Sequence, residues 1–184
     1  QSEGYIDRAS SDLKSYYLSG GYVDEKTMLK AVMFSGHEKT YQAWYGVPVR
    51  YLDSSDTGLR THNPYTYENE VDNYDQTHYQ LHFVQRMGKY SKFNMSLHYT
   101  RGLGYYEQFR TGDALSTYGL ENVFTSAGDT ITNTDLIRRR WLDNHFYGTV
   151  FSYNYKKKAL NLTIGGGANQ YIGGHYGEVV WSQY

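Results

Sequence analysis

The stretch 74–101 shows the clearest pattern of apolar and polar positions in the chain. Its odd positions are apolar: Tyr79, Leu81, Phe83, Phe93, Met95, Leu97 and Tyr99. Its even positions are polar and almost uncharged: Gln76, His78, Gln80, His82, Asn94, Ser96, His98 and Thr100. Because successive side chains of a strand point to opposite faces, this period of two predicts a hairpin of two strands with a short polar turn at 88–91.

The same pattern recurs towards the C-terminus. Over 160–169, Leu160, Leu162, Ile164, Gly166 and Ala168 alternate with Asn, Thr and Gly residues, and residues 144–155 are rich in strand-forming aromatic residues. The run of three lysines at 156–158 predicts a charged turn between these two strands. In 144–155 aromatic side chains occupy both parities, so the pattern does not decide which parity faces outwards.

Two further strands are predicted near the N-terminus, over 13–23 and 27–36, joined by a polar turn at 24–26. Lys30 interrupts the even apolar positions of the second strand. We therefore expect the odd residues Leu29, Ala31 and Met33 to form its outward set.

Short and long connections alternate along the chain. Short turns are predicted at 24–26, 88–91 and 156–158, and long connections at about 37–73, 109–135 and 171–184. Outer-membrane barrels have short periplasmic turns and long extracellular loops, whereas a soluble sandwich has no reason to place all its long loops at one end. The expected strands of roughly 11 to 17 residues also exceed the ~9–11 residues that cross a bilayer.

The composition supports an all-β chain. The 184 residues include 22 Tyr and 19 Gly but 2 Pro and no Cys, which argues against a helical bundle and a disulfide scaffold. The mean hydropathy of -0.73 excludes a transmembrane helix, but alternating barrel strands keep the average low while one face meets lipid. A formal net charge of -1 gives no reason to expect nucleic acid as a partner.

The histidines of the polar face are the first candidates for chemistry. His78 and His82 lie about 13 Å apart along a strand, at ~3.3 Å per residue, so one metal ion cannot join them. A symmetric turn at 88–91 would instead place His82 opposite or diagonal to His98, where two imidazoles could bind a metal or buffer protons. We favour the simpler interpretation, in which these side chains bind water and neighbours, and expect neither a metal nor another cofactor.

Other motifs give a poor case for an enzyme. Glycines at 102–104 and 165–167 do not complete a phosphate-binding loop, and no Ser-His-Asp arrangement or close carboxylate pair is suggested by the spacing. The basic run Arg138, Arg139 and Arg140 could bind lipid phosphates or an anionic ligand, although an ion-paired cluster within a barrel explains it more simply. We expect no catalytic residues.

The connection 37–73 is rich in aromatic and basic residues of the types that contact ligands. Our candidates for ligand contact are Trp44, Tyr45, Arg60, His62 and Tyr65. Packing of a long extracellular loop against itself is the competing explanation, and the two do not exclude each other.

Three stretches carry a resemblance to a known family: FSGHEKTYQAW at 34–44, YENEVDNYDQTHYQL at 67–81 and DLIRRRWLDNHFY at 135–147. They resemble the barrel of TonB-dependent outer-membrane receptors, especially those of Bacteroidetes. The resemblance implies a bacterial outer-membrane transporter with a barrel of about 22 strands, a plug domain in the lumen and energy delivered by TonB. With about six strands, no plug and no TonB box, the chain would be an internal segment of that barrel.

The function expected from this resemblance is import of a scarce nutrient such as a ferric siderophore, haem, cobalamin or a glycan. The odd residues of 79–99 would face lipid, the even residues of 76–100 would line the lumen and dock the plug, and the loops would bind a small molecule or metal chelate. Two alternatives remain open: a small outer-membrane barrel enzyme, and a soluble β-rich protein that binds carbohydrate. Outer-membrane lipid is the further expected partner.

Overall fold

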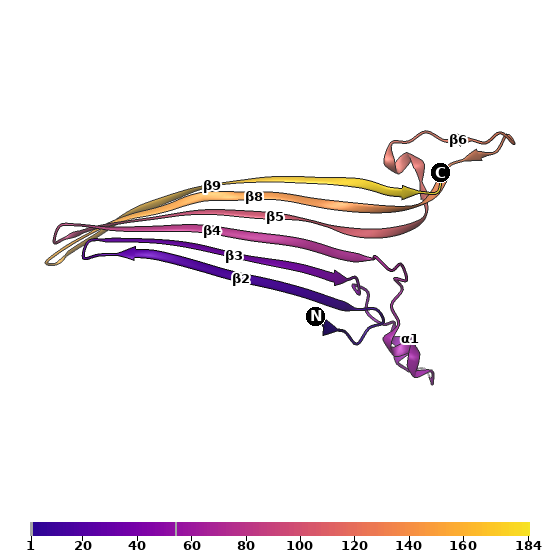
Figure 1. The fold of residues 1–184 in the computed structure, drawn as a ribbon, viewed down its shortest axis with the longest axis horizontal. Coiled ribbons are helices and arrows are strands. Elements are labelled where there is room, and N and C mark those ends of the chain that lie inside the picture. The colour runs from indigo at the N-terminus through magenta and orange to yellow at the C-terminus, as the bar shows by residue number, and fades with distance from the viewer. Residues whose placement is uncertain (1, 54) are drawn as a thin grey trace.

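A computed structural model shows an all-β chain whose long strands form one open antiparallel sheet (Figure 1). It describes residues 2–53 and 55–184. The strand order of this sheet is β1-β2-β3-β4-β5-β8-β9, and the short strands β6 and β7 pair with each other in a separate sheet between β5 and β8 in sequence. The predicted antiparallel all-β class is confirmed, and the described residues leave the sheet open at β1 and β9.

The six long strands have between 14 and 25 residues. Their bounds are Ser10–Val23 (β2), Thr27–Tyr41 (β3), Val71–Met87 (β4), Ser91–Ala114 (β5), Asn133–Lys157 (β8) and Leu160–Ser182 (β9). The short elements are β1 (Ser2–Glu3), α1 (Val49–Leu52), η1 (Thr57–Thr61), η2 (Leu115–Tyr118), β6 (Val123–Phe124) and β7 (Thr130–Ile131).

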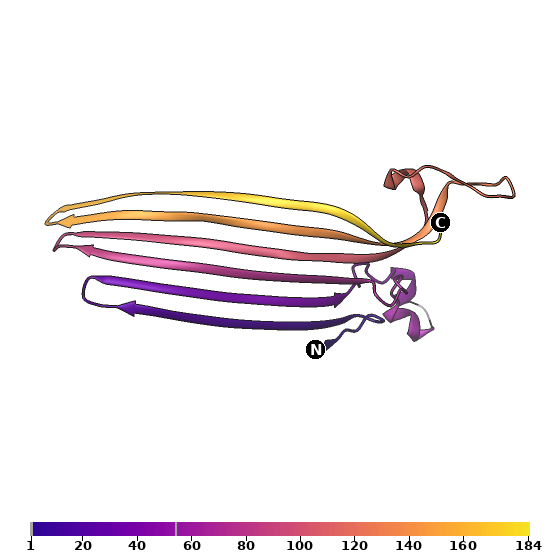
Figure 2. The same cartoon turned by 45° about the horizontal axis from the view of Figure 1, so that its top comes forward.

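The three tight turns between long strands lie at one end of the sheet, and the long connections 42–70 and 115–132 lie at the other (Figures 1 and 2). At the first turn the Asp24 carboxylate accepts hydrogen bonds from the backbone N–H groups of Lys26 and Thr27, each at 2.7 Å. Gly88 and Lys158 take positive φ angles in the other two turns. We call the two ends of the sheet the turn end and the loop end.

One predicted connection is wrong. Residues 171–182 belong to β9 and not to a loop, because the glycines at 173, 174 and 177 pair regularly with β8. The pairing continues to Ser182 with one register shift at Val180, and the glycine content of the segment concealed the strand. The strands extend further towards the loop end than the pattern predicted, so β5 ends at Ala114 and β8 begins at Asn133.

The register divides the sheet into two faces. Leu81 lies opposite Leu97, and Gln80 lies opposite His98. One face, the apolar face, carries the whole predicted odd set: Tyr79, Leu81, Phe83, Phe93, Met95, Leu97 and Tyr99. The other, the polar face, carries the whole predicted even set: Gln76, His78, Gln80, His82, Asn94, Ser96, His98 and Thr100.

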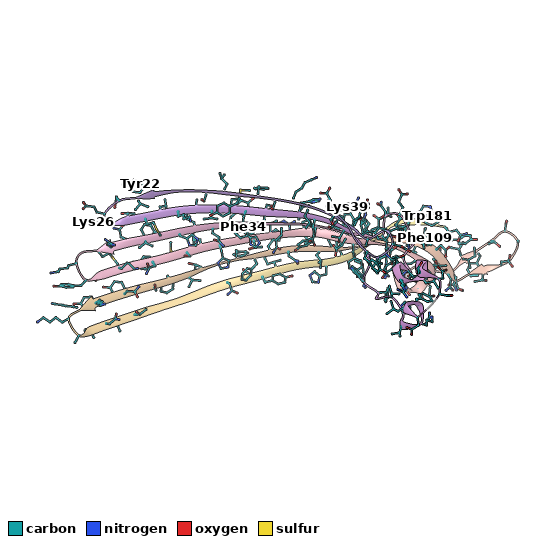
Figure 3. The ribbon with its side chains drawn as sticks, turned by 90° about the horizontal axis from the view of Figure 1, so that it is seen from below. Tyr22, Lys26, Phe34, Lys39, Phe109 and Trp181 are labelled. Carbon is teal, nitrogen blue, oxygen red and sulfur yellow. The ribbon has the colours of Figure 1, made fainter. Side chains whose placement is uncertain are left out.

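The register also decides the parities that the pattern left open. Leu29, Ala31 and Met33 pair with Phe83, Leu81 and Tyr79, so they share the apolar face as expected. The odd residues of β8 pair with Phe93 to Tyr99 and lie on the apolar face as well: Tyr147, Thr149, Phe151 and Tyr153. Side chains therefore stand on both sides of a single curved layer (Figure 3).

The described residues form no extensive hydrophobic core. The buried apolar residues are Val32, Val71, Leu115 and Leu136. On the apolar face Leu81 and Leu97 remain 38% and 41% exposed. An exposed apolar face of this kind is typical of a surface that binds another protein or a membrane.

Candidate functional site

The connection 42–70 is fastened to the loop end of the sheet by buried amides. The Gln42 side chain donates hydrogen bonds to the backbone carbonyls of Val71 and Glu107, at 3.2 and 3.0 Å. The Asn63 side chain donates to the carbonyls of Asp7 and Gln42, both at 3.0 Å. Since each amide joins segments that are distant in sequence, the connection has a fixed path over the end of the sheet.

The predicted loop residues fall into two groups. Tyr45 packs against Tyr65 with their ring centroids 5.5 Å apart, and His62 packs edge-on against Tyr51 at 5.2 Å, as the self-packing explanation requires. Burial, followed by the neighbouring Tyr45 hydroxyl, raises the pKa of Tyr65 to about 12.

Trp44 and Arg60 remain accessible. Arg60 lies exposed in η1. Trp44 is 55% exposed and makes an edge-to-face contact with Tyr106 of β5, with centroids 5.5 Å apart. Among the five predicted loop residues, Trp44 is therefore the one that packs on an aromatic ring of the sheet.

The basic run of β8 is divided between the two faces by strand alternation. Arg139 lies on the apolar face, where its guanidinium donates to the Glu107 carboxylate at 2.8 Å and stacks 4.4 Å from the centroid of Tyr105. Arg138 and Arg140 lie on the polar face, opposite Gln108 and Tyr106. The run is thus not a single basic patch.

Arg138 belongs to a hydrogen-bonded network with the connection that follows β5. Its guanidinium donates to the Gln108 side chain at 3.0 Å and to the Tyr118 hydroxyl at 3.1 Å, and the Asp113 carboxylate lies 3.9 Å away. Partial burial opposes ionisation of Asp113, but hydrogen bonds from Arg110 and Tyr118 outweigh it and lower the pKa of this carboxyl.

Arg140 is exposed and lacks such a network. Its guanidinium donates to the Tyr106 hydroxyl at 2.8 Å, and among the described residues no carboxylate lies within 4 Å of it. Two hollows of about 370 and 420 Å³ adjoin Arg140, and Gly177 of β9 lines both. His175 lines the first hollow and Arg138 the second. We call Trp44, Tyr106, Arg138, Arg140 and His175 the mouth cluster.

A second ionic cluster, centred on Glu107, holds the connection 42–70 against the sheet. The Glu107 side chain is 3% exposed and accepts hydrogen bonds from the Tyr67 hydroxyl at 2.7 Å and from Arg139. Burial, followed by this hydrogen bond, raises the pKa of Tyr67 to about 12. Because these groups satisfy one another, their role is to anchor the connection.

A chain of polar side chains that the sequence pattern did not predict lies on the apolar face. The Tyr99 hydroxyl lies 2.9 Å from His145 Nδ1, His145 Nε2 lies 3.4 Å from the Asp143 carboxylate, and Arg101 pairs with the same carboxylate. The sequence pattern did not decide which residues of 144–155 share a face with Tyr99 and Arg101. The register shows that His145 lies on that face, beside both. The chain marks the point where the apolar face becomes polar towards the loop end.

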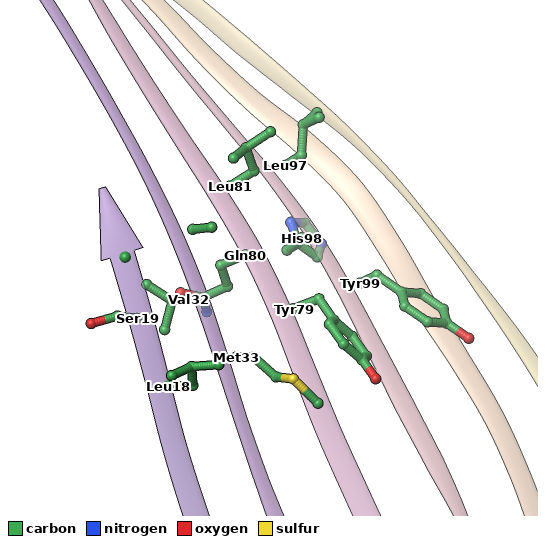
Figure 4. Close-up of a pocket in the computed structure, with 12 residues that line it drawn as sticks. Leu18, Ser19, Val32, Met33, Tyr79, Gln80, Leu81, Leu97, His98 and Tyr99 are labelled. Atoms are coloured by element: carbon green, nitrogen blue, oxygen red, sulfur yellow. The ribbon is translucent and has the colours of Figure 1, made fainter. Parts of the chain in front are cut away.

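The apolar face also contains a hollow of about 390 Å³ (Figure 4). The small residues Gly20 and Ala31 pair there, while Leu81 and Leu97 lie towards the turn end and Met33, Tyr79 and Tyr99 towards the loop end. Its wall is almost wholly hydrocarbon, so it suits an apolar occupant and not a polar ligand.

The predicted polar-face histidines contact neighbouring residues. His78 stacks on Phe34 at 4.4 Å and hydrogen-bonds Thr100 at 2.9 Å, and His82 hydrogen-bonds Ser96 at 3.0 Å. His82 and His98 are diagonal neighbours, the second of the two predicted arrangements. Within the described residues, no three His, Cys, Asp or Glu side chains gather as metal ligands.

Comparison with known proteins gave no family model, curated protein or solved structure that matches this chain. Over the described residues, no helix has the length and apolar character needed to span a membrane.

Proposed function

We propose that this chain forms wall, lumen lining and part of the extracellular mouth of a TonB-dependent transporter in the bacterial outer membrane, as an internal segment of a barrel of about 22 strands. The observation that carries the proposal is the separation of side chains between the two faces of the sheet, which is clearest in β4 and β5. Near the turn end one face is apolar, and the other is mainly polar with Val32, Phe34, Phe146 and Val150 among its apolar members. The long connections 42–70 and 115–132 lie at the opposite end.

The height of the apolar band matches a bilayer. On β8 the aromatic residues from Tyr147 to Tyr155 are eight positions apart, which is about 27 Å at ~3.4 Å per residue. A strand tilted by about 40° turns this into roughly 21 Å of height, close to the ~25 Å apolar band of outer-membrane barrels.

Aromatic residues border this band as they do at membrane interfaces. Tyr79, Tyr99 and Tyr147 form a cross-strand row at the edge of the band nearer the loop end, and the rings of Tyr79 and Tyr99 stack 5.9 Å apart. Immediately beyond them lie the charged side chains of Arg101 and Asp143. An interfacial girdle followed by charged residues fits the transition from hydrocarbon to head groups.

The polar face suits a wet lumen that holds a plug. Its middle rows carry amide, hydroxyl and imidazole groups, and the buried His98 Nε2 has no hydrogen-bond partner within the described residues. Water or a plug domain would supply such partners. The open edge of β9 would pair with the next barrel strand, since a long exposed edge otherwise promotes aggregation.

In this proposal the protein performs no covalent chemistry on its ligand. A scarce nutrient, either a small molecule or a metal chelate, binds at the loop end. TonB then rearranges the plug and opens a path along the polar face. The side chains of this chain bind and orient the ligand, and energy comes from the inner membrane through TonB.

Site-specific labelling tests the membrane orientation. The chain has no cysteine, so Leu97→Cys and His98→Cys each give one attachment point for a fluorophore, on opposite faces of the same strand. In phosphatidylcholine vesicles, brominated acyl chains should quench the label at 97 strongly and the label at 98 weakly. Equal quenching at both positions, or a chain that stays dispersed and monomeric without lipid or detergent, would contradict the proposal.

A further inference from the structure

We propose that the mouth cluster binds a ligand carrying an oxyanion next to a planar ring, with Arg140 as the anion anchor. This inference rests on the proposed function in one respect, because it takes the loop end of the polar face as the surface where ligand arrives. It assigns a chemical class to that ligand from the side chains alone.

Arg140 supplies the positive charge of the proposed site. A guanidinium has five N–H donors in a fixed planar fork that matches a carboxylate or phosphate in two-point contact. The Tyr106 hydroxyl accepts a hydrogen bond from one of these N–H groups. Among the described residues, no carboxylate lies within 4 Å of the Arg140 guanidinium. Two acidic residues lie nearby and have other partners. Glu178 lines the second hollow and accepts a hydrogen bond from Trp141 at 2.8 Å, and Asp113 accepts hydrogen bonds from Arg110 and Tyr118.

Gly177 leaves space for a ligand beside Arg140. This residue lines both hollows beside Arg140, and a Cβ added to it would meet a single neighbouring atom, the Arg139 carbonyl oxygen, at 4.0 Å. The absence of a side chain at 177 therefore keeps open the two hollows that Arg140 lines. A larger residue would fit there without moving the backbone and would fill the space.

The preference for a planar ring follows from Tyr106, which lines the first hollow beside Arg140, and from Trp44, which contacts Tyr106. Tyr106 holds Arg140 through its hydroxyl, and the exposed ring of Trp44 meets the Tyr106 ring edge-on. Exposed aromatic faces bind flat apolar groups, and an arginine beside them adds selectivity for negative charge. His175 contributes a further hydrogen-bonding group to the first hollow.

Benzoate and benzamide form a matched pair of probes, because they share the ring and differ in charge. Binding of each to the full chain in zwitterionic detergent micelles is measured by ligand-observed NMR, with a protein-free micelle blank. Benzoate should bind more tightly than benzamide. Arg140→Gln should weaken benzoate binding about tenfold, the loss expected when a charge-assisted hydrogen bond is removed, and should leave benzamide unchanged.

Two further variants separate charge from folding. Gly177→Val keeps Arg140 but fills the hollows, and it should weaken both probes. Arg86→Gln removes an arginine at the turn end and should change neither. Strand content of each variant is checked by circular dichroism.

Equal binding of benzoate to the parent chain and to folded Arg140→Gln would overturn this inference, as would equal binding of the two probes to the parent chain. Neither result would affect the lipid-quenching difference between positions 97 and 98. The ligand class and the proposed membrane orientation therefore fail separately.

Discussion

Tyr74 on β4 and Gly104 on β5 lie directly opposite each other, and the tyrosine occupies the space that a side chain at 104 would need. A Cβ built on Gly104 would collide with the Asn73 carbonyl oxygen and would lie 2.6 Å from both Cα and Cδ2 of Tyr74. The ring continues along β5 over the buried Gly102, where an added Cβ would meet its phenol. Glycine at these positions lets an aromatic residue lie flat against the neighbouring strand.

Gly104→Ala should therefore lower the free energy of unfolding by about 1–3 kcal/mol, the usual cost of overpacking. Gly36→Ala is the matched control, because Gly36 lies on the same face of β3 and has nothing within 4 Å of an added Cβ. That change should be neutral or stabilise by up to about 1 kcal/mol through the unfolded chain. Urea unfolding in detergent micelles measures both, and equal effects would show that β4 does not crowd position 104 through Asn73 and Tyr74.

Glu107→Gln should release the connection 42–70 from the sheet. The buried carboxylate accepts hydrogen bonds from Tyr67 and Arg139, and loss of its charge should cost about 1.5–3 kcal/mol of unfolding free energy. Near-ultraviolet circular dichroism should change too, since Tyr67 packs 6.0 Å from Phe109. Glu178→Gln is the control: it removes an exposed carboxylate near Arg139 and should cost less than about 1 kcal/mol.

The raised pKa of Tyr67 predicts a loss of stability in alkali. Burial and the Glu107 carboxylate raise this pKa from 10.0 to about 12, so the folded chain retains a proton that the unfolded chain releases. The contribution is complete below pH 10 and declines as the pH rises from 10 to 12. Tyr67→Phe should remove it, so the variant should lose less stability than the parent between pH 9.5 and 12. Urea midpoints across this range provide the measurement, and parallel curves for the two chains would refute the assignment.

The sequence pattern predicts the faces of this sheet well wherever apolar and polar residues alternate strictly. The predicted odd set from Tyr79 to Tyr99 and the predicted even set from Gln76 to Thr100 lie on opposite faces in the observed register. The hairpin turns follow for the same reason, because an interruption of the alternation by lysine, aspartate or glycine identifies them. The pattern is least informative in β8, where Phe146 on the polar face and Tyr147 on the apolar face are both aromatic.

The candidate site was less predictable, because it depends on pairs that no local pattern encodes. Trp44 could be named as a ligand contact from its type and its place in a long connection. Its contact with Tyr106 depends on the path that Gln42 and Asn63 impose on that connection. Arg139 lies on the other face from Arg138 and Arg140 because β8 runs through the basic run. The sequence pattern predicted a strand only from residue 144, so it placed the basic run at the end of a loop.

The two faces can be tested against each other at one point of β4, where Leu81 and Gln80 are neighbours with opposite orientation. Leu81 borders the apolar hollow and is 38% exposed, whereas Gln80 lies opposite His98 on the polar face. If the apolar face meets lipid, Leu81→Lys places a charge in hydrocarbon at a cost of about 2–4 kcal/mol near the bilayer centre. Gln80→Lys leaves the added charge in water and should cost little.

Co-flotation of the chain with phosphatidylcholine vesicles measures the difference, because a neutral bilayer does not attract the new lysine. Membrane association of Leu81→Lys should fall at least about thirtyfold while that of Gln80→Lys stays near the parent value. Similar association of the two variants would mean that Leu81 and its neighbours are covered by something other than lipid.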